Sequence, residues 1–185
     1  MRIELLVEGA TEQVALPSFF KRWLDERLPA PISVKPVSFK GNGQYLTSFA
    51  QRVNRDLEFS EKIAAVGLLD LYGATLESPP NADKYAWAKP ELESRVGHPR
   101  FRQHFAVHEV EAWLLSDPKI FPEPVRKRLA GASHRPESVN FRKPPSKLLQ
   151  QVYLSEKRTY KKTLDGRALF NKLDPNMAYE KCPYR

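Results

Sequence analysis

Apolar residues follow two patterns along the chain, one that predicts strands and one that predicts helices. Short, wholly apolar runs are typical of strands buried in a parallel sheet, whereas apolar residues three or four positions apart are typical of amphipathic helices. Strands are predicted at residues 2–7, 32–39, 63–69 and 101–107. Helices are predicted at residues 12–28, 45–59 and 84–96, the last of them interrupted by Pro90. Pro36 indicates that the second strand lies at a sheet edge. This order predicts an α/β fold, a parallel four-stranded sheet flanked by helices.

Two of the predicted strands end in a carboxylate with a glycine close behind it. Glu8 is followed by Gly9, and Asp70 stands three residues before another glycine. Gly9 permits a turn, and Thr11 is placed to cap a helix that starts near Glu12. Ligands of open parallel sheets bind where strands end. A solvated turn would explain either acid alone, but the pair predicts that Glu8 and Asp70 meet around a cation or a shared proton.

A third acidic stretch, at residues 108–115, follows the fourth predicted strand. Glu109 and Glu111 would lie about 200° apart in a regular helix, so they could face one ion only if Glu109 were still extended. The alternative is that both acids merely favour a helix N-terminus that His108 caps. A zinc site has little support because no second histidine stands at a suitable spacing, and no Gly-x-Ser-x-Gly motif indicates a serine nucleophile.

The charge balance is strongly basic. The chain of 185 residues has 30 lysines and arginines against 22 aspartates and glutamates, for a net charge of +8. Such a surplus favours polyanionic partners such as nucleic acid, although it is also compatible with solubility alone. Much of the excess follows residue 94, whereas the candidate carboxylates precede residue 120. We therefore predict an α/β catalytic core at residues 1–118 and a basic helical extension at residues 119–185 packed on it.

Composition also bounds the setting. The single cysteine, Cys182, excludes an internal disulfide framework and a thiol-rich zinc site. No apolar run approaches the roughly 20 residues that a membrane-spanning helix needs. The first residues lack the basic leader and long apolar core of a secretory signal. We expect a cytoplasmic protein with no membrane partner.

Motifs at the predicted strand ends and in the basic half give the chain a resemblance to a known family. They lie at residues 7–12, 68–73, 108–115, 145–147, 160–162 and 181–183. In these motifs the chain resembles a TOPRIM-related bacterial family, domain of unknown function 4276, allied to the overcoming-lysogenization-defect (OLD) nucleases. The resemblance implies a TOPRIM-like sheet in which Glu8 and Asp70 bind Mg²⁺ or Mn²⁺. Tyr72 departs from the pattern, because many TOPRIM proteins carry a second aspartate there. Glu109 or Glu111 would then complete the metal site.

The activity implied is metal-dependent hydrolysis of phosphodiester bonds, with Glu12 as a general base or an orienting group. Two basic turns, at residues 140–147 and 160–163, each open a predicted helix. Lys147 and Lys161 are therefore candidates for holding the scissile phosphate, although two solvated turns would look the same. DNA is favoured over RNA as the substrate. Relatives imply a phage-defence-like setting and an ABC-type ATPase partner, and this chain has no ATP-binding loop of its own.

Other interpretations stay open at this point. The chain could be a non-catalytic TOPRIM-like subunit that binds nucleic acid, which the tyrosine at position 72 favours. It could instead be a subunit that acts only with a partner, and a homo-oligomer is compatible with either. A metal phosphatase acting on small molecules would leave the spread of basic residues unexplained.

Overall fold

The computed structural model describes residues 1–58, 62–140 and 143–182, and it confirms the predicted parallel sheet. The strands are β1 (Arg2–Val7), β2 (Ser33–Ser38), β3 (Lys62–Asp70) and β4 (Phe101–Ala106), in the order β2-β1-β3-β4. All neighbouring strands are parallel. Pro36 pairs with Leu5 on the edge strand β2, as its missing N–H group predicted.

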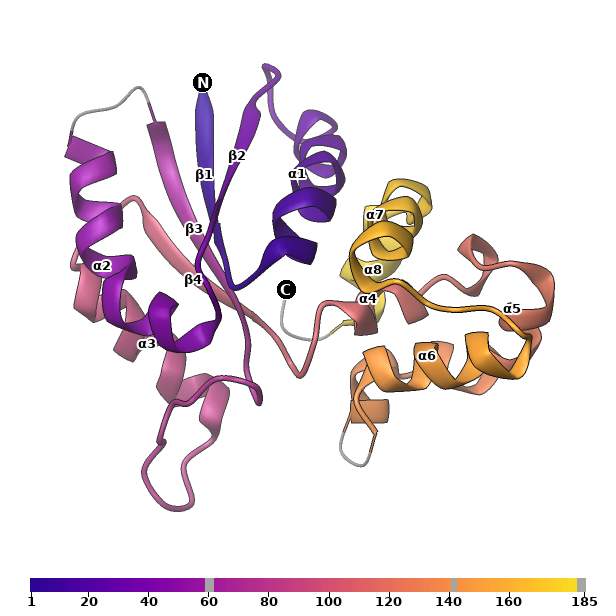
Figure 1. Cartoon of the computed structure of the whole chain (residues 1–185). Coiled ribbons are helices and arrows are strands. Elements are labelled where there is room, and N and C mark those ends of the chain that lie inside the picture. The colour runs from indigo at the N-terminus through magenta and orange to yellow at the C-terminus, as the bar shows by residue number, and fades with distance from the viewer. Residues whose placement is uncertain (59–61, 141–142, 183–185) are drawn as a thin grey trace.

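Helices cover both faces of this sheet (Figure 1). The crossovers are α1 (Ala10–Asp25), α2 (Asn42–Glu58) and α3 (Lys84–Val96). After β4 come α4 (Glu111–Leu115), α5 (Glu123–Leu129), α6 (Pro145–Ser155), α7 (Lys162–Lys172) and α8 (Pro175–Lys181). Three short 3₁₀ helices stand between α4 and α6, at Pro118–Ile120, Ala130–Ser133 and Pro136–Asn140. Figure 1 places α2 and α3 on one side of the sheet and α1 with the C-terminal helices on the other.

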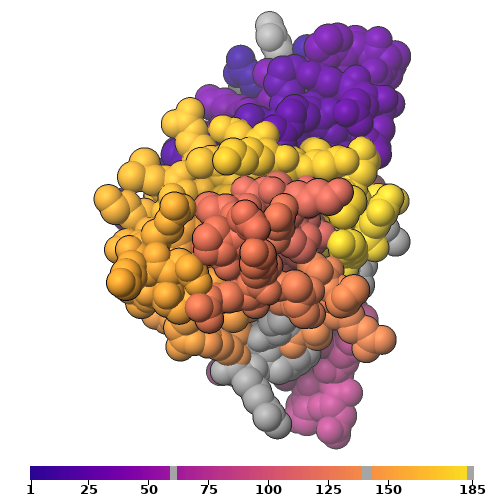
Figure 2. All heavy atoms as spheres, turned by 90° about the vertical axis from the view of Figure 1, so that its right-hand side faces the viewer, coloured from indigo at the N-terminus to yellow at the C-terminus, as the bar shows by residue number. Residues whose placement is uncertain are grey.

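Two apolar clusters fill the space on either side of the sheet. Because neighbouring strand residues face opposite ways, Leu6 and Leu69 pack toward α2 and α3, whereas Leu5 and Leu68 pack toward α1. The second of these clusters also contains Phe170 of α7. The C-terminal helices, which form the side of the molecule seen in Figure 2, therefore share a core with the sheet. A boundary at residue 118 stays a prediction, and no separate core marks it in the described residues.

Several predicted boundaries are wrong in detail. Thr11 does not cap α1, which begins at Ala10 because the Glu12 carboxylate accepts the Gly9 N–H group at 3.1 Å. That helix ends at Asp25, before the prolines expected to stop it, and α2 starts three residues early at Asn42. Pro90 lies within α3 without interrupting it. The predicted helix end at Phe59, Arg142 in the first basic turn and Pro183 in the last motif lie outside the described residues. No helix of the described ranges is long and apolar enough to span a bilayer.

Glu137 is a buried carboxylate that joins the C-terminal half to the end of β4. Its Oε2 accepts the Val107 N–H group at 3.2 Å, and the side chains of Trp113 and Cys182 also hydrogen-bond to it. Burial raises the pKa of Glu137 to about 7 from an ordinary 4.5. The folded protein therefore binds this proton more tightly than the unfolded chain does. The resulting stabilisation is complete below pH 4.5 and is lost as the pH rises through 7.

We expect Glu137→Gln to remove this pH dependence. The variant should match the wild type near pH 5, where Glu137 is mostly protonated, and should be more stable at pH 8 by up to about 3 kcal/mol. Urea unfolding of both proteins at the two pH values measures the difference. An equal gap at pH 5 and pH 8 would contradict the assignment.

Candidate active site

Four carboxylates gather at the edge of the sheet where the parallel strands end. Glu8 follows β1, Asp70 is the last residue of β3, Glu12 lies in the first turn of α1, and Glu111 opens α4. Burial raises the pKa of Asp70 well above its ordinary value, and Glu12, Glu111 and Glu8 raise it further by repulsion. The structure thus brings Glu8 and Asp70 into one electrostatic neighbourhood, together with two more acids from separate elements.

Glu8 and Glu12 are held differently within this acidic cluster. Glu12 is almost completely buried, and its bond to the Gly9 N–H group fixes it over the turn between β1 and α1. Burial raises the pKa of Glu8, and the neighbouring Glu12 adds to the shift. The Glu8 Oε2 atom is buried and has no hydrogen-bond partner among the described residues. Glu8 therefore offers an unused oxygen inside the cluster.

Lys162, the first residue of α7, supplies positive charge to the cluster. Its Nζ lies 3.1 Å from Glu111 Oε1 and 4.0 Å from Glu109 Oε1. Burial raises the pKa of Glu111 to about 7, even though Lys162 lowers it. Burial alone would lower the pKa of Lys162, but Glu111 and Glu109 raise it overall. One ammonium group thus partly neutralises two glutamates and also acts on Asp70.

The two glutamates of the third acidic stretch have different partners. Glu109 precedes α4 and accepts the Ser146 N–H group at 2.8 Å and the Ser146 hydroxyl at 2.9 Å. It therefore fixes the first turn of α6. Glu111 has a fully buried side chain, and its Oε2 has no hydrogen-bond partner in the described part of the chain. Both acids approach the Lys162 ammonium, whereas the sequence predicted a shared metal ion, and that metal role stays a prediction. His108 does not cap α4, whose N-cap residue is Val110.

The two lysines predicted to hold phosphate are exposed. Lys147 lies in the first turn of α6, next to the serine that Glu109 binds. Lys161 directly precedes α7, and its backbone N–H donates to Asp165 at 2.5 Å. Sequence analysis chose Lys161 over its neighbour, yet Lys162 is the residue turned into the cluster. Lys162 stands four positions before the buried Gly166 and so shares its helix face, but only the structure shows that this face is the buried one.

The donor set fits a hard divalent cation in kind. Carboxylate oxygens are the ligands that Mg²⁺ and Mn²⁺ prefer, and Glu8 and Glu111 each carry a buried oxygen without a hydrogen bond. No three histidine, cysteine, aspartate or glutamate side chains in the described ranges lie close enough together to hold a metal as they stand. Metal binding at Glu8, Asp70 and Glu111 would therefore require these side chains to turn toward one another.

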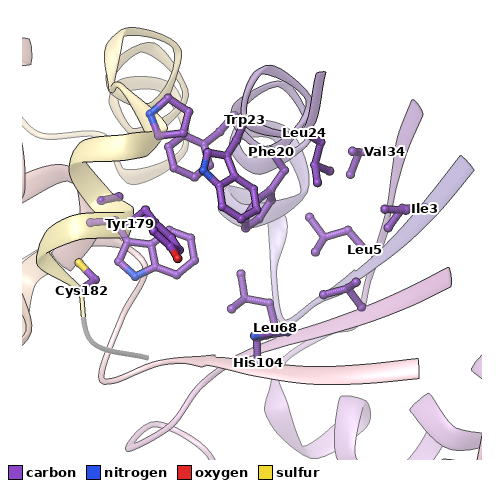
Figure 3. A pocket seen from close by; sticks show the side chains of 15 residues that line it. Ile3, Leu5, Phe20, Trp23, Leu24, Val34, Leu68, His104, Tyr179 and Cys182 are labelled. Carbon is purple, nitrogen blue, oxygen red and sulfur yellow. The ribbon is translucent and has the colours of Figure 1, made fainter. Parts of the chain in front are cut away.

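A separate apolar cavity of about 220 Å³ lies on the face of the sheet that α1 covers (Figure 3). Leu68 and His104 form part of its floor, and Phe20 and Trp23 of α1 and Tyr179 of α8 surround it. Right-handed crossovers explain why this face has room for a cavity. Of the first three helices, they place only α1 on it. Its lining is almost wholly apolar, so it suits neither a metal ion nor a phosphate group, and we place the chemistry at the acidic cluster.

Comparison with known proteins agrees with this fold. The model of the family "Domain of unknown function (DUF4276)" matches residues 7–184. The chain belongs to this family. No curated protein matches it.

Solved structures similar to this DUF4276 chain come from OLD proteins. The C-terminal region of the Burkholderia pseudomallei OLD protein is 18% identical, with 95% of this chain and 90% of that one covered and a TM-score of 0.53. The C-terminal region of the Xanthomonas campestris pv. campestris OLD protein is 16% identical, with 98% and 88% covered and a TM-score of 0.50. At these identities the likeness shows the fold, and it supports the predicted relationship to OLD proteins at that level.

Proposed function

We propose that this DUF4276 protein is a TOPRIM-type nuclease that hydrolyses phosphodiester bonds with Mg²⁺ or Mn²⁺. The observation that carries the proposal is the gathering of Asp70 and three further carboxylates, from separate elements, at the sheet edge. A cluster of like charges is costly to a fold and normally persists because a cation or a reaction needs it. The basic surplus of the chain supports a polyanionic substrate, with DNA favoured over RNA.

Each residue of the cluster has a distinct role in this proposal. Glu8, Asp70 and Glu111 hold the metal, which when bound supplies a Lewis acid and lowers the pKa of a water molecule. Glu12, fixed by the Gly9 N–H group, orients the cluster or accepts a proton from the attacking water. Lys162 places its ammonium group where negative charge develops on the phosphate.

The direct test is a cleavage panel with purified protein. Supercoiled, linear and single-stranded DNA and a structured RNA are incubated with Mg²⁺, with Mn²⁺ and with EDTA. The proposal predicts cleavage of at least one substrate with metal and none in EDTA. An ABC-type ATPase partner, which we also propose from the OLD relationship, should be added in a second series. Absence of cleavage in every condition, with and without the partner, would refute a nuclease function.

Lys161 and Lys162 are adjacent, so their substitution gives a matched pair of variants that tests the role of Lys162. We expect Lys162→Met to lower cleavage at least tenfold, because a half-buried charge that would face the substrate phosphate is lost. Lys161→Met, which removes an exposed charge one residue away, should stay within about threefold of the wild type. Single-turnover rates measure both, and circular dichroism checks that each variant is folded. A larger loss in the Lys161 variant would return the role to the residue predicted from sequence.

A non-catalytic nucleic-acid-binding subunit is the second candidate. It is favoured by the lack, in the described ranges, of three side chains ready to hold a metal, and by Tyr72 at a position where an aspartate was expected. Under this alternative the Lys162 ammonium takes the place of a metal permanently. Binding of DNA that is equally tight in EDTA and in Mg²⁺, without cleavage, would identify it.

A further inference from the structure

The apolar cavity beside α1 is large enough to hold a small molecule. Its volume of about 220 Å³ is open space between α1, α8 and the sheet (Figure 3). Protein interiors are packed as densely as organic crystals and hold few voids larger than a water molecule, so a space of this size is unusual. An engineered apolar cavity of about 150 Å³ stays dry and binds benzene. By that comparison, this cavity has room for a molecule somewhat larger than benzene.

The walls of the cavity are fixed to one another. Arg22 of α1 donates to the Leu173 carbonyl at the end of α7, at 2.8 Å. Arg27, just after α1, lies over the Trp23 ring at 4.6 Å and hydrogen-bonds to the Asn176 side chain on α8. These contacts tie α1 to the C-terminal helices on the opposite wall. The cavity is therefore formed before a ligand arrives, and a preformed site loses little affinity to reorganisation.

The lining favours an uncharged ligand with aromatic rings. No lysine, arginine, aspartate or glutamate stands among the described residues that line the cavity. A charged ligand would lose its hydration there without gaining an opposite charge. Aromatic side chains form much of the wall, and they pack well against other rings in offset or edge-to-face geometry. They are Phe19, Phe20, Trp23, Trp113 and Tyr179.

His104 places a polar group on the floor of the cavity. It pairs with Leu68 across β3 and β4, and Figure 3 shows the two side chains together. Burial lowers the pKa of His104 below its ordinary 6.5, and Lys89 lowers it further against an opposing effect of Glu93, so the imidazole is uncharged at neutral pH. The imidazole makes no hydrogen bond to another described residue, and both ring nitrogens keep some accessible surface. A neutral imidazole has one nitrogen that accepts a hydrogen bond, so His104 can bind an N–H or O–H group of a ligand.

We propose that this cavity binds an uncharged aromatic small molecule of about two fused rings, whose N–H or O–H group donates to His104. Apolar walls with a few polar groups that fix orientation are typical of small-molecule sites. This inference goes beyond the proposed nuclease function and does not depend on it. The two sites are neighbours on β3, because Leu68 lines the cavity and Asp70 belongs to the acidic cluster.

The test uses indole as the probe, because it is uncharged and has two fused rings and one N–H group. Indole carboxylate keeps the rings and adds a negative charge at neutral pH. Isothermal titration calorimetry measures both compounds against the wild type, Val66→Trp and His104→Leu. Val66 is a partly buried residue of β3 that lines the cavity, so a tryptophan there should fill it. Val14→Trp is the matched control, because Val14 is 39% exposed on α1 and does not line the cavity.

We expect the wild type to bind one indole with a Kd below about 300 μM, and indole carboxylate at least about tenfold more weakly. Val66→Trp should weaken indole binding at least about tenfold, and Val14→Trp should leave it unchanged. His104→Leu should weaken it about fivefold, as the loss of one hydrogen bond does.

Three results would overturn the proposal: indole binding only above millimolar concentration, equal binding of the carboxylate, or normal binding by a folded Val66→Trp. Normal indole binding by His104→Leu would overturn the hydrogen bond to His104. Circular dichroism checks folding, and if Val66→Trp does not fold, the carboxylate and His104→Leu comparisons decide. No cleavage is measured, so a failure of the nuclease function would leave these results unaffected.

Discussion

Replacing Asp70 by asparagine is expected to abolish metal-dependent cleavage and to make the folded protein more stable at pH 8. The activity falls because asparagine is neutral and a weaker ligand. Loss of a group that only supports a metal ligand typically costs 10- to 100-fold, so loss of the ligand itself should cost at least about 100-fold. The stability rises because burial and the charges of Glu8, Glu12 and Glu111 disfavour an ionised Asp70 in the folded state. We expect the free energy of unfolding to rise by about 0.5–2 kcal/mol, the usual size of a stabilising substitution, because the repulsion between the carboxylates is reduced.

Opposite changes in rate and stability distinguish this explanation from simple misfolding. Cleavage rates at several Mn²⁺ concentrations and urea unfolding are measured for the wild type, Asp70→Asn and the control Glu180→Gln. Glu180 is an exposed acid on α8, away from the cluster, so its variant should change neither quantity. A destabilised Asp70→Asn would show that the carboxylate supports the fold. Full activity in the asparagine variant would remove Asp70 from the proposed mechanism.

The sequence was sufficient for the sheet and for the meeting of its two strand-end acids. Strands β1 and β3 carry apolar residues on both faces, as Leu5 and Leu6 show, and that pattern is typical of a sheet covered on both sides. Pro36 marked the edge because a proline cannot donate to a ladder on both sides. Once the strands are parallel, Glu8 and Asp70 must end at the same edge. Local patterns and chain topology determine these features without any knowledge of tertiary contacts.

Partners distant in sequence decided the features that could not be predicted. Glu109 binds Ser146, which lies 37 residues away, and this contact separates its role from that of Glu111. Lys162 reaches the cluster because α7 packs beside α1. Ser18 of α1 donates to Asn171 at 2.8 Å, and Arg22 donates to the Phe170 carbonyl at 2.8 Å. No periodicity in the chain encodes which of two adjacent lysines such packing will turn inward.

Gly67 shows a second limit of sequence analysis. In the middle of β3 it interrupts an otherwise apolar run, and a glycine there would ordinarily weaken a strand. A side chain at this position would clash with Tyr45 and Gln103, which form a buried hydrogen bond of 2.8 Å between Tyr45 Oη and Gln103 Oε1. The glycine makes room for a polar contact between α2 and β4. That requirement is visible only when the three residues are seen together.

A buried ion cluster on the α2 side of the sheet gives the largest expected effect on stability. The Glu4 side chain is fully buried on β1, and Lys62 Nζ lies 2.7 Å from its Oε1 and 3.1 Å from Asp56 Oδ2. Burial raises the pKa of Glu4, and the hydrogen bond from Lys62 opposes this shift. We expect Lys62→Met to destabilise the protein by about 3–5 kcal/mol at pH 8, because it leaves a buried carboxylate without its closest cation.

The same physics predicts how this loss depends on pH and on a second substitution. Without Lys62 the folded-state pKa of Glu4 rises further, so protonation restores stability at low pH and the loss should be smaller at pH 5 than at pH 8. Adding Glu4→Gln should recover a large part of it, because the uncompensated charge is gone. Lys21→Met is the matched control, since the Lys21–Asp25 pair lies on the surface and should contribute less than about 1 kcal/mol. Equal losses in the Lys62 and Lys21 variants, measured by urea unfolding, would show that burial of Glu4 carries no such cost.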